Sequence, residues 1–331
     1  MNCTTALSVA ERIGPKQRGA SWRQWWCGCC LGLAATFGWA GSSAFCTETV
    51  ELHPAQQDRL IRVAGIIKAE LETSGHQAAI VARSGLALQR LGQRYSHAGV
   101  SLRHSPNAPW SVRQLYFACD EQRPRIFDQG LPGFVLGVED ADVGFVSVLL
   151  LPAQPEALLT HTALNDTVAL QLLSPRYSAN AHAYSTLFQN CNQWLAELLA
   201  TAWSLQPLAA DTLTARTHAQ HWLRDAGYQA TELDVRWPPL LWLAGLSPWL
   251  HTRDHPEADL QAGTLRVSMP DGLAQFVRQR YPHTQSWEFC YTAQHVVWRR
   301  NGPALPMACT PAPGDRLYML QSTAPSTVEA D

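Results

Sequence analysis

Cys191 has the sequence surroundings that a nucleophilic thiol needs. It follows Asn190, and apolar residues then recur at the three- and four-residue spacing of a buried helical face: Trp194, Leu195, Leu198 and Leu199. Asn190 suits the N-cap, because its side chain can accept a hydrogen bond from a free backbone N–H. Cys191 would then lie in the first turn, where the helix dipole stabilises a thiolate and lowers the thiol pKa. The alternative is a small buried cysteine that only packs.

A cysteine nucleophile also needs a base within hydrogen-bond reach and a group that orients the base. Residues 95–103 alternate like a strand, with His97, Gly99 and Ser101 on one face. Residues 110–117 predict the next strand, and Gln114 is the one polar member of its face. A buried amide needs a hydrogen-bond partner, and an imidazole on the neighbouring strand would serve. We therefore predict His97 as base and Gln114 as orienter; the alternatives are a structural histidine and a glutamine satisfied by backbone.

The N-terminus indicates export. A basic region that includes Lys16 and Arg23 precedes an apolar run over about residues 25–40, and the small residues Ser42 and Ala44 fit cleavage after Ala44. We expect residues 1–44 to be a signal peptide, the mature chain to be periplasmic or secreted, and no transmembrane span to remain. The alternative is an uncleaved anchor, although the run is short for a membrane span.

Export changes the cysteine count. Five of the nine cysteines remain in the mature chain: Cys46, Cys119, Cys191, Cys290 and Cys309. In an oxidising compartment four can pair and one stays free, as a catalytic Cys191 would. The other four allow three pairings if Cys191 is free. We favour Cys290 with Cys309, because the segment between them looks like a local hairpin.

Composition and missing motifs exclude several other classes of protein. The chain has 331 residues, of which 46% are hydrophobic and 16% charged, so it can bury a core, and its net charge of -2 gives no support to nucleic-acid binding. Walker, dinucleotide-binding, Gly-x-Ser-x-Gly and His-Glu-x-x-His motifs are absent, so we expect no cofactor. His218 and His221 are three residues apart but lack a third ligand, and His251, Asp254 and His255 form another weak metal candidate. A metal-binding protein is therefore a third alternative, and we expect no metal site.

Hydrophobic periodicity and turn residues predict the elements that position these side chains. Helices are predicted over residues 54–74, 155–173, 191–199, 214–226 and 268–280, with a helical turn at 86–91. Strands are predicted over residues 78–82, 95–103, 110–117, 144–151, 265–267, 287–291 and 295–299. Residues 120–125 are expected to form a charged loop, 130–137 a turn-rich segment, 174–187 an irregular loop, and 237–251 a core hairpin of short helices or a binding surface.

Two motifs carry a resemblance to known families. Ser96-His97-Ala98-Gly99-Val100, followed by Asn190-Cys191-Asn192-Gln193-Trp194, resembles the circularly permuted papain-like superfamily, which includes permuted NlpC-type amidases and lecithin retinol acyltransferase-like enzymes. The histidine precedes the cysteine, the reverse of papain's order. Residues 77–203 resemble an uncharacterised family of exported bacterial proteins, domain of unknown function 2145, with similarity over about residues 50–300.

The resemblance implies an α+β, permuted papain-like fold in which an antiparallel sheet packs against the nucleophile helix. The domain would span residues 45–205, an α/β C-terminal extension residues 206–310, and a partly disordered tail residues 311–331. Cys191 would be the nucleophile, His97 the base and Gln114 the orienter, with His104 as a competitor for the third role. The backbone N–H groups of Cys191 and a neighbour would bind the oxyanion.

The implied function is an exported thiol amidase or peptidase, or an acyltransferase, of the cell envelope. Its substrate would be an amide or ester in a peptide, in peptidoglycan or in a lipid, and the reaction would pass through an acyl-enzyme. The alternative function is a non-catalytic module that keeps the papain-like scaffold for binding or assembly.

Overall fold

An eight-stranded antiparallel sheet runs through the computed structural model, which describes residues 52–86, 88–138, 140–204, 209–235 and 249–320. Its strands are β1 (Ala78–Arg83), β2 (His97–Leu102), β3 (Ser111–Ala118), β4 (Arg123–Gln129), β5 (Gly144–Leu150), β8 (Gln285–Tyr291), β9 (His295–Arg300) and β10 (Arg316–Met319). Their order across the sheet is β10-β9-β8-β5-β1-β2-β3-β4. β1 and β5 therefore lie side by side at the centre, with β2, β3 and β4 beyond β1 and with β8, β9 and β10 beyond β5.

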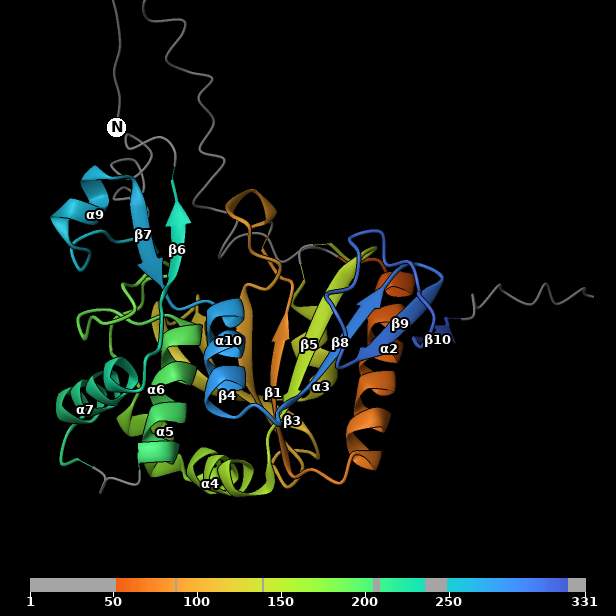
Figure 1. Ribbon diagram of the computed structural model, residues 1–331, viewed down its shortest axis with the longest axis horizontal. Helices are drawn as coiled ribbons and strands as arrows, with labels where there is room; N and C mark the ends of the chain where they lie inside the picture. The colour runs from red at the N-terminus through yellow and green to blue at the C-terminus, as the bar shows by residue number, and fades with distance from the viewer. Residues whose placement is uncertain (1–51, 87, 139, 205–208, 236–248, 321–331) are drawn as a thin grey trace, which may run out of the picture.

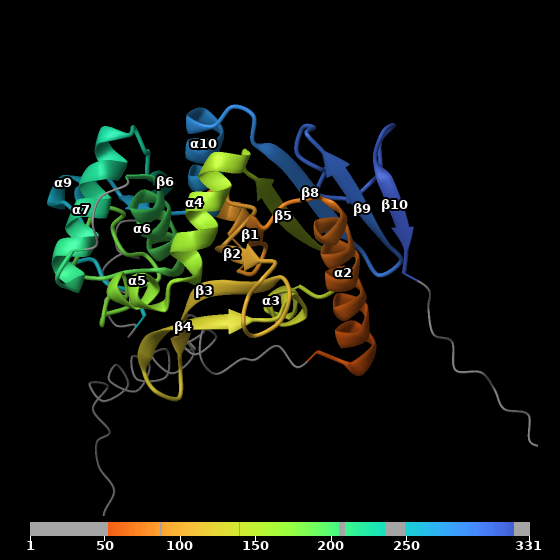
Figure 2. The same ribbon diagram turned by 90° about the horizontal axis from the view of Figure 1, so that it is seen from below.

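Helices cover both faces of this sheet (Figure 2). One face carries α2 (Pro54–Thr73) and α3 (Leu131–Leu136), and the other carries α4 (Ala153–Leu164), α6 (Cys191–Ser204) and α10 (Pro270–Arg280). The short α5 (Asp166–Gln171) follows α4, and α7 (Thr212–Asp225) packs on α6. A two-stranded antiparallel sheet of β6 (Thr231–Asp234) and β7 (Thr264–Val267) lies with α9 (Glu257–Gln261) beyond α6 (Figure 1). The result confirms a mixed α+β fold built on an antiparallel sheet.

The central strands are buried on both faces, so alternate side chains enter two different cores. On β1, Ala79 and Val81 pack with α2, whereas Ile80 and Ala82 pack with the α6 side. Such strands appear in the sequence as continuous apolar runs rather than as alternating ones. The residue types alone therefore do not show on which face of the sheet a side chain lies. The pairing register of the strands shows it.

The predicted helix over residues 155–173 is two helices. Asn165 separates α4 from α5, and its side chain accepts hydrogen bonds from the backbone N–H groups of Thr167 and Val168. An N-cap inside an apolar periodic stretch starts a new helix, because the asparagine side chain replaces the backbone acceptor. The prediction of one continuous helix was wrong for this reason.

Three other segments differ from expectation. The charged loop predicted over residues 120–125 runs into β4, an edge strand paired with β3 that contains Pro124. The turn-rich segment holds α3, with Pro132 in its first turn. β10 forms within the predicted tail and pairs with β9. Edge strands with proline and charges lack the apolar alternation by which strands are recognised.

The C-terminal third contributes strands to the same sheet, since β8 pairs with β5 along its length. The boundary predicted between residues 205 and 206 stays a prediction. Residues 236–248, which hold most of the segment predicted over 237–251, lie outside the described residues. So do the predicted signal peptide and residues 321–331 of the predicted tail. Among the residues that the structure describes, none of the helices has the length and apolar character of a membrane span.

The cysteines pair as we favoured where the structure describes both partners. Cys290 and Cys309 form a disulfide with their Cα atoms 5.7 Å apart, which joins β8 to the segment after β9. Cys119 is also disulfide-bonded, and Cys46 lies outside the described residues. Cys191 is a free and buried thiol. Among the cysteines that the structure describes, the free one is thus the predicted nucleophile.

Candidate active site

Cys191 is the first residue of α6, and Asn190 caps that helix. Asn190 Oδ1 accepts a hydrogen bond of 2.7 Å from the backbone N–H of Gln193, as the sequence predicts. Asn190 Nδ2 also donates to the carbonyl of Ala179, 3.2 Å away, in the irregular loop before the helix. The cap therefore fixes both where α6 begins and how the chain approaches it.

The loop over residues 174–190 is held by polar side chains that are themselves buried. Glu197, on the second turn of α6, is completely buried and accepts hydrogen bonds from Arg216 Nε at 2.8 Å and from Gln189 Nε2 at 2.6 Å. Arg216 donates in turn to the carbonyls of Thr186, at 2.8 Å, and Phe188, at 3.0 Å. This network joins α6, α7 and the loop that ends at Cys191.

His97 begins β2 and contacts Gln114 on β3, as predicted. A short hydrogen bond joins His97 Nε2 to Gln114 Oε1. Gly99 makes this approach possible, because a Cβ there would lie 2.8 Å from the carbonyl oxygen of Arg113 and 3.1 Å from Gln114 Cβ. His104, the competing candidate, lies on an exposed turn beyond β2. Gln114 is therefore the polar side chain that orients His97.

The hydrogen bonds of Gln114 fix the protonation of His97. Gln114 Nε2 donates to Gln129 Oε1 at 2.8 Å, so the oxygen of its amide faces the imidazole. An amide oxygen only accepts hydrogen bonds, so His97 Nε2 carries a proton. In the neutral ring the other nitrogen, Nδ1, is then an acceptor, which is the form that a general base needs.

Contacts with the residues before and after His97 in the chain place the Cys191 thiol at the start of β2. The backbone N–H groups of Asn192 and Ala98 hydrogen-bond the sulfur. Asn192 Nδ2 donates to the carbonyl of Ser96 at 3.1 Å, which ties the first turn of α6 to the same strand end. Within the described part of the chain, no hydrogen bond joins the Cys191 sulfur to the His97 ring, whose bond goes to Gln114. The thiol therefore contacts the backbone next to His97, whereas the His97 ring lies on the side of the sheet that carries α3, 6.0 Å from the Phe134 ring.

Burial has the largest effect on the pKa values of the Cys191 thiol and the His97 imidazole. It raises the pKa of Cys191 to about 12, although the N–H of Asn192, the Arg83 guanidinium and other backbone N–H groups favour the thiolate. The sequence predicts a lowered pKa at a helix N-terminus, so the sign of that prediction was wrong. Burial, and then the positive charge of Arg83, lower the pKa of His97 to about 3. At neutral pH the resting site therefore holds a neutral thiol and a neutral imidazole.

This resting state predicts a distinctive pH dependence for the thiol. Only thiolate reacts with iodoacetamide, and below the thiol pKa its fraction grows about tenfold per pH unit. With a pKa of about 12, the alkylation rate of Cys191 should keep rising from neutral pH to about pH 10. Mass spectrometry of the alkylated peptide measures that rate, and Cys191→Ser gives the background. A rate that levels off at or below about pH 8 would show a preformed thiolate instead.

Arg83 is the residue of this site that sequence reasoning missed. It ends β1 and pairs directly with His97 across the β1–β2 ladder, so both side chains point to the same face of the sheet. The guanidinium lies 5.5 Å from the centre of the Phe134 ring, and the His97 ring lies 6.0 Å from the same centre. The sequence feature that could have pointed to it is an arginine directly after the apolar run of residues 78–82.

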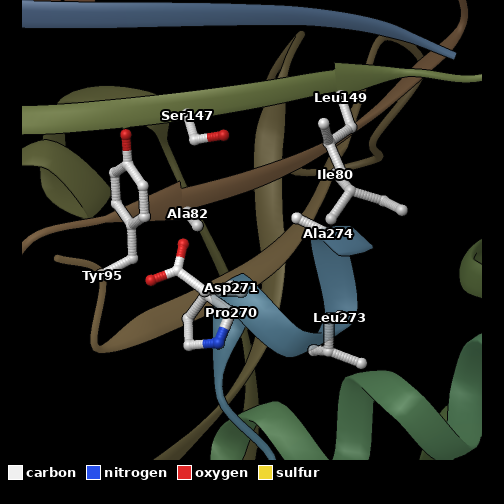
Figure 3. Close-up of a pocket in the computed structure, with 10 residues that line it drawn as sticks. Ile80, Ala82, Tyr95, Ser147, Leu149, Pro270, Asp271, Leu273 and Ala274 are labelled. Carbon is white, nitrogen blue, oxygen red and sulfur yellow. The ribbon is translucent and has the colours of Figure 1, made fainter. Parts of the chain in front are cut away.

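A small pocket lies on the face of the sheet that carries α6 and α10, opposite the face of the Arg83 and His97 side chains (Figure 3). Ala98, next to His97, lines it together with Tyr95, Ser147 and Asp271, and Asp271 is turned toward Tyr95 (Figure 3). Its volume of about 20 Å³ is room for about one water molecule, so it is too small to hold a substrate.

The histidines considered for metal binding do not converge. His218 and His221 lie on α7, His251 stacks on Phe188 with ring centres 4.3 Å apart, and His255 Nε2 bonds the carbonyl of Asn180 at 2.8 Å. Over the described residues, no three His, Cys, Asp or Glu side chains are grouped so that they could hold a metal ion.

The chain matches the model of a protein family. A family model described as "Uncharacterized protein conserved in bacteria (DUF2145)" matches residues 70–277, more than half of the chain. The matched span includes Arg83, His97, Gln114 and Cys191. No curated protein and no solved structure matches the chain.

Proposed function

The chain belongs to this DUF2145 family of bacterial proteins, and we propose that it is an exported thiol amidase or peptidase, or an acyltransferase, that works through an acyl-enzyme on Cys191. One observation carries the proposal. The single free cysteine among the described residues starts a capped helix, and the backbone that contacts it flanks a histidine held by an amide in the acceptor tautomer. A thiol, an imidazole and an amide that holds the imidazole are the three groups that thiol acyl transfer would use.

The proposed reaction assigns each group one step. His97 Nδ1 takes the thiol proton while the sulfur attacks the carbonyl carbon of an amide or ester. The resulting oxyanion accepts hydrogen bonds from the backbone N–H groups of Cys191 and Asn192, which already point at the sulfur. The carbonyl re-forms, the leaving amine or alcohol takes the proton from His97, and a thioester remains on Cys191. Water then gives hydrolysis, whereas another nucleophile gives acyl transfer.

The opposite pKa shifts of the two groups do not forbid this proton transfer. Each pKa shift reflects the cost of burying one charge alone. The proton transfer instead creates a thiolate and an imidazolium at the same time. Attraction between two such charges is strong where little water separates them, so the pair costs less than the two separate charges. Substrate that displaces water from the site would favour the pair further.

A relationship to the permuted papain-like superfamily is part of the proposal. It is supported by the order His97 before Cys191, by the histidine at the start of a strand of an antiparallel sheet, and by the cysteine at the start of a helix packed on that sheet. The motif order within this α+β fold carries the assignment.

We further propose that the reaction takes place in the periplasm or outside the cell, on an amide or ester of a peptide, of peptidoglycan or of a lipid. The proposed signal peptide over residues 1–44 lies outside the described residues. Support comes from the Cys290–Cys309 bridge and from the disulfide-bonded Cys119, since disulfides persist in oxidising compartments.

A non-catalytic binding or assembly module is the second candidate. The observation that favours it is the burial of the thiol, which is only 7% exposed and whose pKa is raised to about 12. A cysteine in such a setting can serve as packing alone. This reading predicts that Cys191 can be replaced without loss of any chemical activity.

An esterase assay separates the two candidates. We expect the purified mature protein to release p-nitrophenolate from p-nitrophenyl acetate, and Cys191→Ser to lose that release while it keeps the wild-type circular dichroism spectrum. Glycinamide, a weakly nucleophilic amine, added as acceptor distinguishes the two chemistries, because a transferase forms acetylglycinamide faster than the Cys191→Ser background and a strict hydrolase forms only acetate. Equal rates for wild type and Cys191→Ser would exclude the enzyme and leave the binding module.

A further inference from the structure

The guanidinium of Arg83 is a buried charge opposite His97 that has no carboxylate partner among the described residues. Arg83 is 8% exposed, and its Nε has no hydrogen-bond acceptor among the described residues. No salt bridge to Arg83 occurs in the described part of the chain. An unpaired buried charge lowers the stability of the folded protein. We therefore expect that a ligand pairs with Arg83.

The surrounding backbone is shaped around this guanidinium. A Cβ at Gly85 would lie 2.5 Å from Arg83 Nη1, and a Cβ at Gly137 would clash with Nη2. The Phe134 ring packs against the guanidinium through a cation–π contact. Glycine on two sides and an aromatic ring hold the cation in place. Arg83 faces His97 across the β1–β2 ladder and shares the Phe134 ring with it, and its charge acts on both Cys191 and His97.

We propose that Arg83 binds a carboxylate of the substrate, so that the protein acts on amides or esters that carry a carboxylate close to the bond that Cys191 attacks. This inference rests on the proposed function and adds the substrate class to it. A peptide bond next to a free C-terminal carboxylate has the required chemistry. A guanidinium matches a carboxylate in shape and charge, because the two planar groups can form parallel hydrogen bonds. A phosphate would bring up to two negative charges to a single buried cation, which leaves charge uncompensated.

A pair of thiol reagents that differ only in charge tests this assignment. Iodoacetate and iodoacetamide both place a two-carbon group on the Cys191 sulfur and release iodide, but iodoacetate carries a carboxylate. The ratio of their rate constants cancels the thiolate fraction, so an effect of Arg83 on the thiol pKa leaves the ratio unchanged. Peptide mass spectrometry after brief exposure gives both rates for Cys191.

We expect the iodoacetate-to-iodoacetamide ratio to be at least about tenfold lower in Arg83→Gln than in wild type, because a charge-assisted hydrogen bond is lost. Arg90→Gln is the matched control; it removes the same charge from an exposed position and should leave the ratio unchanged. The wild-type protein alone gives a second comparison. Its iodoacetate-to-iodoacetamide ratio should be higher in the native state than in the urea-unfolded state. This comparison does not depend on the folding of Arg83→Gln.

An equal ratio in wild type and Arg83→Gln would overturn the inference, and so would a native wild-type ratio no higher than the ratio in urea. The proposed function is tested separately by acylation of Cys191 with uncharged p-nitrophenyl acetate. If acylation occurs but the iodoacetate-to-iodoacetamide ratio is the same in wild type and Arg83→Gln, only the proposed substrate class is wrong. If acylation does not occur, the proposed function is wrong whatever the ratio shows.

Discussion

Replacement of Glu197 by alanine should lower the free energy of unfolding by about 3–5 kcal/mol, because it leaves Arg216 as an unpaired buried cation. The Glu197 carboxylate is completely buried and accepts hydrogen bonds from Arg216, Gln189 and Gln220. The Arg216 side chain is 2% exposed and cannot turn to water without movement of α7. Urea unfolding followed by tryptophan fluorescence measures the change.

Glu232→Ala is the matched control for this prediction. Glu232 also pairs with an arginine, Arg266, with 3.1 Å between their atoms, but its side chain is 63% exposed. Surface ion pairs contribute little to stability, so this variant should unfold at nearly the wild-type urea concentration. If Glu197→Ala were as stable as Glu232→Ala, the network would not be what holds the loop that ends at Cys191.

Replacement of His97 by glutamine should slow the acetylation of Cys191 by p-nitrophenyl acetate at neutral pH by at least about 100-fold, since general-base assistance contributes about 10²–10⁴. The thiol pKa of about 12 makes the effect large, because very little thiolate forms without a proton acceptor. Stopped-flow release of p-nitrophenolate from limiting ester gives the acetylation rate. Glutamine is close to histidine in size and keeps a hydrogen-bonding group near Gln114.

His104→Gln controls for the loss of a histidine as such, because His104 lies on an exposed turn. It should acetylate at the wild-type rate. Gln114→Ala should fall between the two, because it removes the group that orients the ring but leaves the base. A His97→Gln rate within about threefold of wild type would remove His97 from the mechanism, since even a weak general base contributes more.

The parts of the site that the sequence predicts depend on local patterns. Asn190 and Cys191 are adjacent to the helical stripe that they begin, and a cap acts within three residues. His97 and Gln114 lie on consecutive strands, so strand alternation alone brings them together once the register is right. The same holds for the Cys290–Cys309 pair, whose partners lie 19 residues apart.

The missed parts depend on distant neighbours. Arg83 belongs to the site because β1 pairs with β2 in a register that sets it opposite His97, and the apolar run before it gives no sign of that pairing. The pKa of Cys191 has the opposite sign to the expected one, because burial under the whole fold outweighs the local helix dipole. β10 is recognisable only from its pairing with β9 at the sheet edge.

Detection of a covalent acyl-enzyme tests the central claim most directly. Native protein is mixed with p-nitrophenyl acetate at neutral pH, quenched in acid within seconds and digested, and the peptide that contains Cys191 is weighed by mass spectrometry. A mass increase of one acetyl group on Cys191, lost in His97→Gln and on incubation with hydroxylamine before the quench, is the predicted result. An unmodified Cys191 in protein whose folding has been verified would contradict the claim and leave this cysteine a packing residue.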